Sequence, residues 1–341
     1  MFEKFKESLG INSFHYQIPL HSNKIPYTLG GITLISLIIL FISGFILTQF
    51  YNPAISDANR SILYIKDDLY LGWFVRGIHY WAVQIITVTV SLHLIRVFMT
   101  SSYKSPREFT WFSGVLLLSI IGGFIFTGTV LKWDQEGYEA LQHHLWVMEK
   151  IGVIGNIFLE NFSRINMLGR LYTVHISILP ILFLLLLLFH LFHIKIHGIS
   201  PLPWGGEIKA KSPELVSGMI DFTSHIKQLI KYGLFTLLLI SILTLVIEPP
   251  LGGEPVEGVE VTKPPWMFLW LYSLENIWVY SLIVAPSIIF TALILLPFVD
   301  RSSSIKLHER KVAIVIFIIM LLTMVGLIIN GIVTTAGHHM E

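Results

Sequence analysis

Residues 73–99 are long enough and apolar enough to cross a membrane, and they contain two histidines, His79 and His93. An α-helix turns by about 100° per residue, so positions fourteen apart return to nearly the same face, about 21 Å further along the axis. Polar rings inside a bilayer are costly unless something binds them. Arg76 and Arg96, each three residues outside a histidine, need anionic partners for the same reason. This stretch predicts a membrane helix that binds a ligand at two depths.

The rest of the chain is similarly apolar. Of its 341 residues 54% are hydrophobic and 13% charged, and the mean hydropathy is +0.71, which excludes a soluble domain. Spanning a bilayer takes about 20 apolar residues. The predicted fold class is therefore an all-α integral membrane protein with seven transmembrane helices, at 29–50, 73–99, 111–131, 171–194, 229–247, 277–299 and 312–336.

A linker rich in Pro, Gly and Lys, residues 195–228, separates the first four helices from the last three. We predict an N-terminal interfacial segment at 1–28, a four-helix domain at 29–200 and a three-helix domain at 201–341. The first residues lack the basic and apolar regions of a signal peptide. The sequence has no cysteine, which excludes disulfides, cysteine-ligated iron–sulfur clusters and ordinary thioether-linked haem within this chain.

Lys and Arg are concentrated at the N-terminus and in the connections after the second, fourth and sixth helices. Cytoplasmic loops carry an excess of these residues. The predicted protein is multi-pass, in a bacterial-type inner (plasma) membrane, with the N-terminus cytoplasmic and the C-terminus outside.

The fourth helix contains a second pair of histidines, His175 and His190, fifteen residues apart and within about 60° of one face. The second and fourth helices run in the same direction, from outside to inside. His79 and His175 therefore lie near the outer surface, and His93 and His190 near the inner one. Two histidines can supply both axial ligands of a haem iron. The predicted cofactors are two non-covalent b-type haems, with the four histidines as the iron ligands.

Glycines on the first and third helices have a matching spacing: Gly30 and Gly44 are fourteen residues apart, and so are Gly114 and Gly128. Glycine allows a flat macrocycle to approach a helix backbone closely. Because these helices run in the opposite direction, Gly30 and Gly114 lie at the inner depth, and Gly44 and Gly128 at the outer depth. Any one of these spacings alone could reflect helix packing.

Other histidines allow several interpretations. His193 could face the inner aqueous boundary or a quinone, and His143 and His144 are expected at the surface or in contact with a partner. Pro180 predicts a kink in the fourth helix.

Six motifs resemble cytochrome b of the Rieske/cytochrome b (cytochrome bc) complexes, especially the chloroplast-type cytochrome bf branch. They are YTLGGITL at 27–34, RGIHYW at 76–81, KSPREFTWFSGV at 104–115, KWDQEGY at 132–138, RLYTVHISILP at 170–180 and HGISPLP at 197–203. The fifteen-residue histidine spacing is also that branch's pattern. The resemblance implies that its four-helix and three-helix subunits are fused here.

The resemblance implies a subunit of a quinol:cytochrome c, or related-acceptor, oxidoreductase. In that family quinol is oxidised near the outer haem. One electron leaves through a Rieske iron–sulfur protein towards a c-type cytochrome, and the other passes through both haems to an inner quinone, with proton translocation. It further implies a homodimer that uses ubiquinone or menaquinone, and no nucleic-acid partner.

The family's site residues can be matched to this chain. Arg76 matches an arginine that pairs with an outer-haem propionate, and Arg107, with Lys104, is placed for the inner propionates. Lys195 aligns with a basic residue of the inner quinone site, or is a positive-inside anchor. Asp221 could donate a proton there. Three residues of the segment that walls the family's quinol pocket are Trp133, Asp134 and Tyr138.

Two positions depart from the family pattern. The family signature Pro-Glu-Trp-Tyr reads Pro264-Pro265-Trp266-Met267, so the glutamate that could accept a quinol proton is proline. Either another group accepts the proton, with Tyr272 and Glu275 as candidates, or the outer site has lost this reaction. Glu275 could equally be a helix-end or partner contact. We assign Pro264, Trp266, Tyr272 and Glu275 to the catalytic site.

The second departure is Thr28, which replaces the cysteine that attaches an extra c-type haem in the chloroplast-type branch, so that covalent link cannot form. Two other functions remain open. A dihaem membrane anchor without bifurcation would exchange electrons between the quinone pool and another partner, and would purify without a Rieske protein. A cofactor-free transporter would show no haem absorbance.

Overall fold

The computed structural model describes residues 16–153, 155–156, 167–202, 218–300, 302 and 304–335. Within these ranges seven helices are long and apolar enough to cross a membrane. They are α2 (Ile25–Thr48), α4 (Gly72–Met99), α5 (Glu108–Leu131), the continuous run of α8 (Met167–Thr173), η3 (Val174–Ile178) and α9 (Leu179–His197), then α10 (Phe222–Val246), α12 (Ser281–Val299) and α13 (Lys311–Val333). Each coincides with a predicted segment, which confirms the all-α membrane fold. Residues 1–15 of the predicted N-terminal interfacial segment lie outside the described residues.

Helix ends differ from the prediction where polar residues extend a helix beyond the apolar segment. α10 begins at Phe222 rather than 229, because its first turns contain His225 and Lys227. α2 begins at Ile25, with Pro26 in its first turn, where the missing N–H of proline costs no hydrogen bond. Hydropathy therefore locates the membrane-spanning part of each helix but not its full length.

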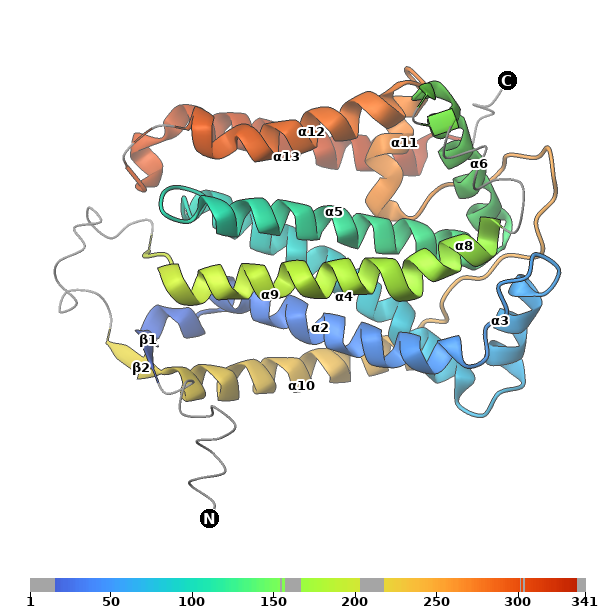
Figure 1. The fold of residues 1–341 in the computed structure, drawn as a ribbon, viewed down its shortest axis with the longest axis horizontal. Helices are drawn as coiled ribbons and strands as arrows, with labels where there is room; N and C mark the ends of the chain where they lie inside the picture. Colours follow the sequence, from blue (N-terminus) through green and yellow to red (C-terminus); the bar gives the residue numbers. More distant parts are fainter. Residues whose placement is uncertain are drawn as a thin grey trace, which may run out of the picture.

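The helices run side by side along the long axis of the molecule (Figure 1). α2 packs on α4 and α5 on α9, which forms a four-helix bundle. α10 lies along α2 and α4, whereas α12 packs on α5 and α13 on α11 (Leu269–Glu275). The last three long helices thus flank the bundle on opposite sides.

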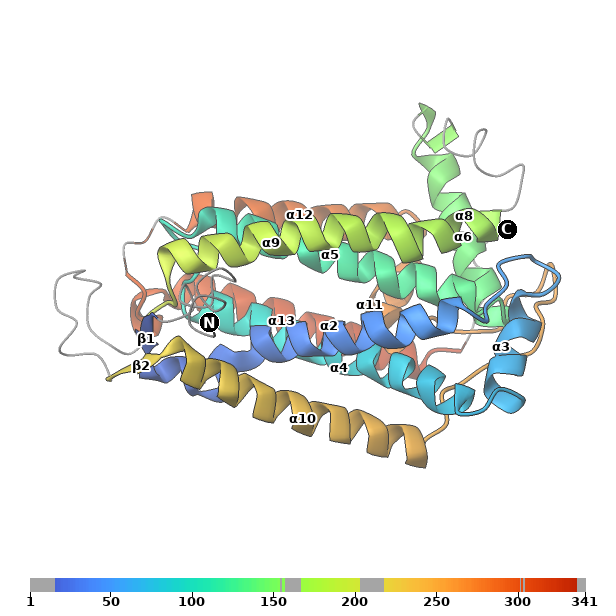
Figure 2. The ribbon, with the colours of Figure 1, turned by 60° about the horizontal axis from the view of Figure 1, so that its bottom comes forward.

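The two ends of the bundle are built differently (Figure 2). One end, which we call the ribbon end, has a short antiparallel ribbon in which β1 (Gln17–Pro19) pairs with β2 (Met219–Asp221), followed by η2 (Leu20–Asn23). The other, the α6 end, contains α3 (Ala58–Asp67), α6 (Gln135–Lys150), η5 (Trp266–Phe268) and α11. A further short helix, η6 (Leu307–Glu309), joins α12 to α13. Our sequence-based orientation places the α6 end outside.

The core of the bundle lies midway between these ends. A cluster of buried apolar side chains combines residues of all four helices: Leu37, Ile86, Leu117, Ile121 and Phe183. Leu37, Ile86, Ile121 and Phe183 lie about midway between the two glycines or the two histidines of their helices, and Leu117 lies one turn from Ile121. This apolar layer separates two levels at which the polar rings are found.

Candidate functional site

The four histidines lie at two levels of the bundle. His79 and His93 are on α4, whereas His175 lies in η3 and His190 in α9. His175 is within electrostatic range of His79, and His93 within range of His190. We call these the α6-level pair and the ribbon-level pair. The structure therefore brings together the pairs that the spacing predicts.

Each of the four glycines contacts one of these imidazole rings. A Cβ atom at Gly30 would lie 3.0 Å from Cε1 of His93, and one at Gly44 would lie 3.1 Å from Cε1 of His79. At Gly114 the same atom would be 3.3 Å from Cε1 of His190, and at Gly128 3.2 Å from Cε1 of His175. Few real Cβ contacts are this close. The glycines thus make room for the histidine rings themselves, at the depths expected from the sequence.

Three of the four rings are held by a hydroxyl group on the neighbouring helix. Nδ1 of His79 lies 3.0 Å from Oγ of Ser43, Nδ1 of His190 lies 2.9 Å from Oγ of Ser113, and Nδ1 of His175 lies 2.8 Å from Oγ1 of Thr127. Each hydroxyl residue directly precedes the glycine that faces the same ring. One Ser-Gly or Thr-Gly dipeptide therefore supplies both the space for a ring and its hydrogen bond.

The direction of these hydrogen bonds fixes the tautomer of the rings. The single hydroxyl hydrogen of each residue already donates to a carbonyl four residues earlier: Ser43 to Ile39 at 2.8 Å, Ser113 to Phe109 at 2.8 Å and Thr127 to Gly123 at 2.7 Å. The hydroxyl oxygen must then accept from Nδ1–H. The lone pair of the neutral imidazole is consequently on Nε2, and this atom can bind a metal.

His93 differs from the other three histidines. Its Nδ1 is buried and has no hydrogen-bond partner within the described part of the chain. The residue before Gly30 is Leu29, which carries no hydroxyl.

A π-helical turn explains how fifteen residues can separate the two histidines of the fourth membrane helix. The turn η3 spans Val174–Ile178 and contains His175. A π-turn accommodates one extra residue without interrupting the helix. The remaining fourteen steps bring His190 back to nearly the same face. Pro180, for which a kink was expected, follows directly in the first turn of α9.

The arginines and lysine matched to haem propionates contact the chain itself. Arg76 donates to the carbonyl oxygens of Pro249 and Pro250, at 3.2 and 2.8 Å. Arg107 donates to the carbonyl of His197 at 3.0 Å. Lys104 pairs with Asp300 at 3.1 Å, in a ribbon-end network that also contains the buried Arg310. Lys104 therefore fastens the α12–α13 connection to the bundle.

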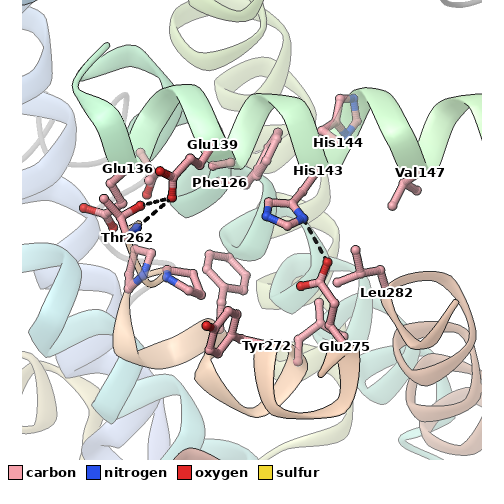
Figure 3. Close-up of a pocket in the computed structure, with 16 residues that line it drawn as sticks. Phe126, Glu136, Glu139, His143, His144, Val147, Thr262, Tyr272, Glu275 and Leu282 are labelled. Carbon is pink, nitrogen blue, oxygen red and sulfur yellow. Dashed lines mark hydrogen bonds and ion pairs between the residues drawn. The ribbon is translucent and has the colours of Figure 1, made fainter. Parts of the chain in front are cut away.

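A cavity of about 250 Å³ opens at the α6 end, between α6 and the η5–α11 segment (Figure 3). Its wall is mostly apolar and includes Phe126, Pro264, Pro265, Phe268 and Leu282. It adjoins the α6-level pair, because Phe126 and Thr129 line it while Thr127 and Gly128 between them contact His175.

Two of the assigned catalytic residues, Tyr272 and Glu275, line this cavity from α11, and Pro264 lines it as well. Trp266 does not; its indole N–H donates to Oε1 of Gln84 on α4, at 2.7 Å. The side chain of Trp266 therefore anchors η5 to the bundle.

Nearby residues of the KWDQEGY motif have structural contacts. Asp134 caps α6 by accepting from the backbone N–H of Gly137 at 3.0 Å, and it also accepts from Gly252 N at 3.0 Å. Trp133 lies in a buried apolar cluster against which Tyr138 packs. The motif walls the cavity through Glu136 instead, and α6 continues the wall with Glu139, Ala140 and His143.

The expectation that His143 is a surface residue is wrong. Its imidazole lies between two buried carboxylates, with Nδ1 2.9 Å from Oε1 of Glu275 and Nε2 3.2 Å from Oε1 of Glu260. Burial alone would lower the pKa of His143, but the two carboxylates outweigh this effect and raise the pKa to about 9. His143 is therefore positively charged at neutral pH. No sequence pattern predicts this contact, because its members are far apart in the chain.

At the ribbon end Lys195 and Asp221 lie near one aromatic pair. The Nζ atom of Lys195 is 6.0 Å from the centre of the Tyr16 ring, which stacks on Phe222 next to Asp221. Asp221 accepts from Oγ1 of Thr223 at 2.8 Å. His193 donates to the carbonyl of Phe189 at 2.9 Å.

This donor set fits haem rather than a bare metal ion. No group of three or more His, Cys, Asp or Glu side chains suited to an ion occurs within the described ranges. A haem iron has four ligands from its macrocycle and needs only two more, which each histidine pair can supply through Nε2. The fold and the site together assign this chain to the class of haem-binding, multi-pass membrane proteins.

Comparisons with known proteins specify the family. The sequence model of the cytochrome b/b6/petB family matches residues 15–198, and the chain belongs to this family. It is 38% identical over 188 residues to cytochrome b6 of Acaryochloris marina (strain MBIC 11017), covering 54% of this chain and 87% of that protein. It is also 38% identical over 210 residues to cytochrome b6 of Desmonostoc sp. (strain PCC 7906), covering 59% and 97%.

The whole fold has a counterpart among solved structures. A chain of "Hyperthermophilic respiratory Complex III" superposes with a TM-score of 0.81 and 23% identity, over 98% of this chain and 92% of that chain. The protein is thus a haem-containing electron-transfer subunit of a membrane oxidoreductase complex of the bc or b6f type, with b-type haem as its cofactor.

Proposed function

We propose that this chain is the cytochrome b subunit of a quinol:cytochrome c, or related-acceptor, oxidoreductase of the Q-cycle type. His79 and His175 would hold one b-type haem, and His93 and His190 a second. Bound haem supplies a one-electron carrier at each level. The N-terminus would be cytoplasmic, in a bacterial-type inner membrane, and the module boundary would lie near residue 200.

The observation that carries this proposal is the position of the cavity. One short stretch of α5 lines the cavity with Phe126 and Thr129 and contacts His175 through Thr127 and Gly128. A quinol head group in the cavity would lie beside the α6-level pair. The apolar wall would exclude water from it.

The cavity also provides a group for proton transfer. Proline at 265 cannot accept a proton, but Glu275 lines the same cavity from α11. Its side chain is only 4% exposed and pairs with His143. A carboxylate at this place would accept the proton that a quinol hydroxyl releases on oxidation.

The same proposal includes the electron-transfer partners and a second quinone site. Electrons from the cavity would leave to a Rieske iron–sulfur protein and onward to a c-type cytochrome, within a homodimeric complex. At the ribbon end, Lys195 and Asp221 would border the site of quinone reduction, with ubiquinone or menaquinone as the substrate. The nearby Tyr16–Phe222 pair would form one wall of that site.

The test is to purify the complex from its native membrane and identify the proteins that accompany this chain. A Rieske protein, together with haem that quinol reduces, supports the proposal. Replacing Glu275 by Gln should slow quinol oxidation by about tenfold to a hundredfold, the usual range for removal of a proton-transfer group. A complex without a Rieske protein, in which E275Q has wild-type turnover, would instead indicate a dihaem anchor that does not bifurcate electrons.

A further inference from the structure

The carboxylates that line the α6-end cavity differ in how they are held. Glu139 accepts from the backbone N–H groups of Val261 and Thr262, both at 2.9 Å, and so ties the connection after α10 to α6. Glu136 forms an ion pair with Lys132. Among the described residues Glu275 has neither kind of contact, and its ion-pair partner is the imidazole of His143.

His143 joins two carboxylates from different parts of the chain. Glu275 is at the end of α11, whereas Glu260 belongs to the connection between α10 and η5. The side chains of Glu275 and Glu260 are 4% and 7% exposed, and that of His143 is 21% exposed. Figure 3 shows the ring of His143 and the carboxylate of Glu275 pointing towards one another across the cavity.

The carboxylates of Glu275 and Glu260 determine the charge of the His143 ring. Burial disfavours a charged imidazole, whereas two carboxylates at hydrogen-bond distance favour it more strongly, so the pKa of His143 is about 9. A positive charge next to a carboxylate favours its ionised form. The other titratable side chains around this part of the cavity are Glu136, Glu139 and His144 on α6 and Tyr272 on α11.

We propose that His143 is the positioning residue of the proton-accepting carboxylate: its Nδ1 fixes Oε1 of Glu275, while Glu260 holds the other nitrogen of the same ring, Nε2. This inference rests on the proposed function. One carboxylate oxygen of Glu275 is paired with Nδ1, which leaves the other for substrate. When quinol is oxidised, its O–H bond breaks and the proton forms an O–H bond with Glu275. The electrons leave to the one-electron acceptors of the proposed function.

The pair of Glu275 and His143 would compensate for the proline at position 265. In the family signature the carboxylate is part of the Pro-Glu-Trp-Tyr turn itself. Here the same cavity obtains its carboxylate from Glu275, ten residues further along the chain, and the cation that stabilises it from α6. The base would thus lie at the far end of the η5–α11 segment from Pro265.

The experiment compares the pH dependence of quinol oxidation in the purified complex, between about pH 5 and pH 9, for wild type and His143→Gln. Removing a cation next to a carboxylate raises the pH at which the carboxylate loses its proton by about one unit or more. We expect the acid limb of the H143Q profile to move upward by that amount. At pH values on the acid limb of both profiles the rate should then fall about tenfold, with a much smaller loss near pH 8.5.

Two further variants separate charge from structure. His143→Lys retains a cation and should restore much of the wild-type acid limb, whereas Glu260→Gln should give a smaller shift than H143Q. His308→Gln provides the matched control, because that histidine is 73% exposed on the α12–α13 connection. If the H143Q complex does not assemble, the pH profiles of H143K and E260Q can still be compared with that of wild type.

A second readout does not depend on turnover. The infrared absorption of a protonated carboxyl group, identified by its loss in Glu275→Gln, should appear at higher pH in H143Q than in wild type. An assembled H143Q complex with the wild-type pH profile and the wild-type carboxyl titration would overturn this inference. A wild-type complex that does not oxidise quinol at all would instead overturn the proposed function.

Discussion

The two histidine levels have the same backbone plan but differ in how their rings are held. At the α6 level Ser43 and Thr127 accept from the Nδ1 atoms of His79 and His175. At the ribbon level only His190 has such a partner, Ser113, and the Nδ1 of His93 has none among the described residues. A glycine contacts the ring in all four cases.

This difference separates two requirements of a haem ligand. Space for the ring comes from glycine at every position, whereas tautomer and orientation come from the hydroxyl residue before the glycine at three of them. Groups that hydrogen-bond to a ligating histidine fix its orientation and raise its basicity. His93 has the space without the hydrogen bond, so we expect the two levels to respond differently to substitution.

The largest effect should come from removing a ligand at one level. His79→Leu should abolish binding of the α6-level haem and His93→Leu that of the ribbon-level haem, because an iron needs both axial ligands for a six-coordinate site. Each variant should retain about half of the haem. Haem content and redox titration of the purified complexes would measure this. Loss of both haems from each variant would show that the levels are not independent.

Glycine substitution should have an intermediate effect. A methyl group at Gly30 would lie 3.0 Å from Cε1 of His93, and overpacking of this kind costs about 1–3 kcal/mol. Gly30→Ala should therefore weaken haem binding at the ribbon level. Gly122→Ala on α5 is the control, because nothing lies within 4 Å of its Cβ position. Thermal stability and haem retention would distinguish them, and equal behaviour would contradict the role assigned to the ring contact.

Changes to the hydroxyl residues leave the space for the ring intact, so both haems should stay bound, and they test the comparison most directly. Thr127→Val removes only the partner of His175, and loss of such a partner costs about tenfold to a hundredfold in metal affinity. We expect a changed midpoint potential at the α6 level alone. Ser119→Ala is the control, since that hydroxyl donates to the Val115 carbonyl and contacts no histidine.

The reverse change tests the other level. Leu29→Ser would place a hydroxyl before Gly30, as at the other three positions, and should alter the ribbon-level potential only. A wild-type potential in both T127V and L29S would mean that these hydroxyl groups do not tune the ligands.

Much of this arrangement could be predicted from the sequence, because spacing along a helix determines depth and face. His79, His93, Gly30 and Gly44 needed only the α-helical repeat to be assigned to their levels. The hydroxyl partners were also visible, as Ser-Gly and Thr-Gly dipeptides, but a pattern of glycines alone does not show which atom occupies the space. That required the positions of the rings.

The contacts at the α6 end could not be predicted in this way. His143 and Glu275 lie on different short helices, and Glu260 lies in an irregular connection, so no helical repeat relates them. Their contact depends on how α6 and α11 close over the end of the bundle. A residue expected at the surface can become half-buried there, as His143 does.

The π-turn at Val174–Ile178 has a consequence for how related chains can vary in length. A deletion of one residue in the π-turn would convert it into a regular α-helical turn. The histidines would then be fourteen residues apart, and their rings would keep the same positions. An insertion elsewhere between His175 and His190 would not be accommodated by the π-turn and would rotate one ligand away from its partner. Aligned sequences of this helix can therefore differ by a gap at this turn while the ligands they encode remain superimposable.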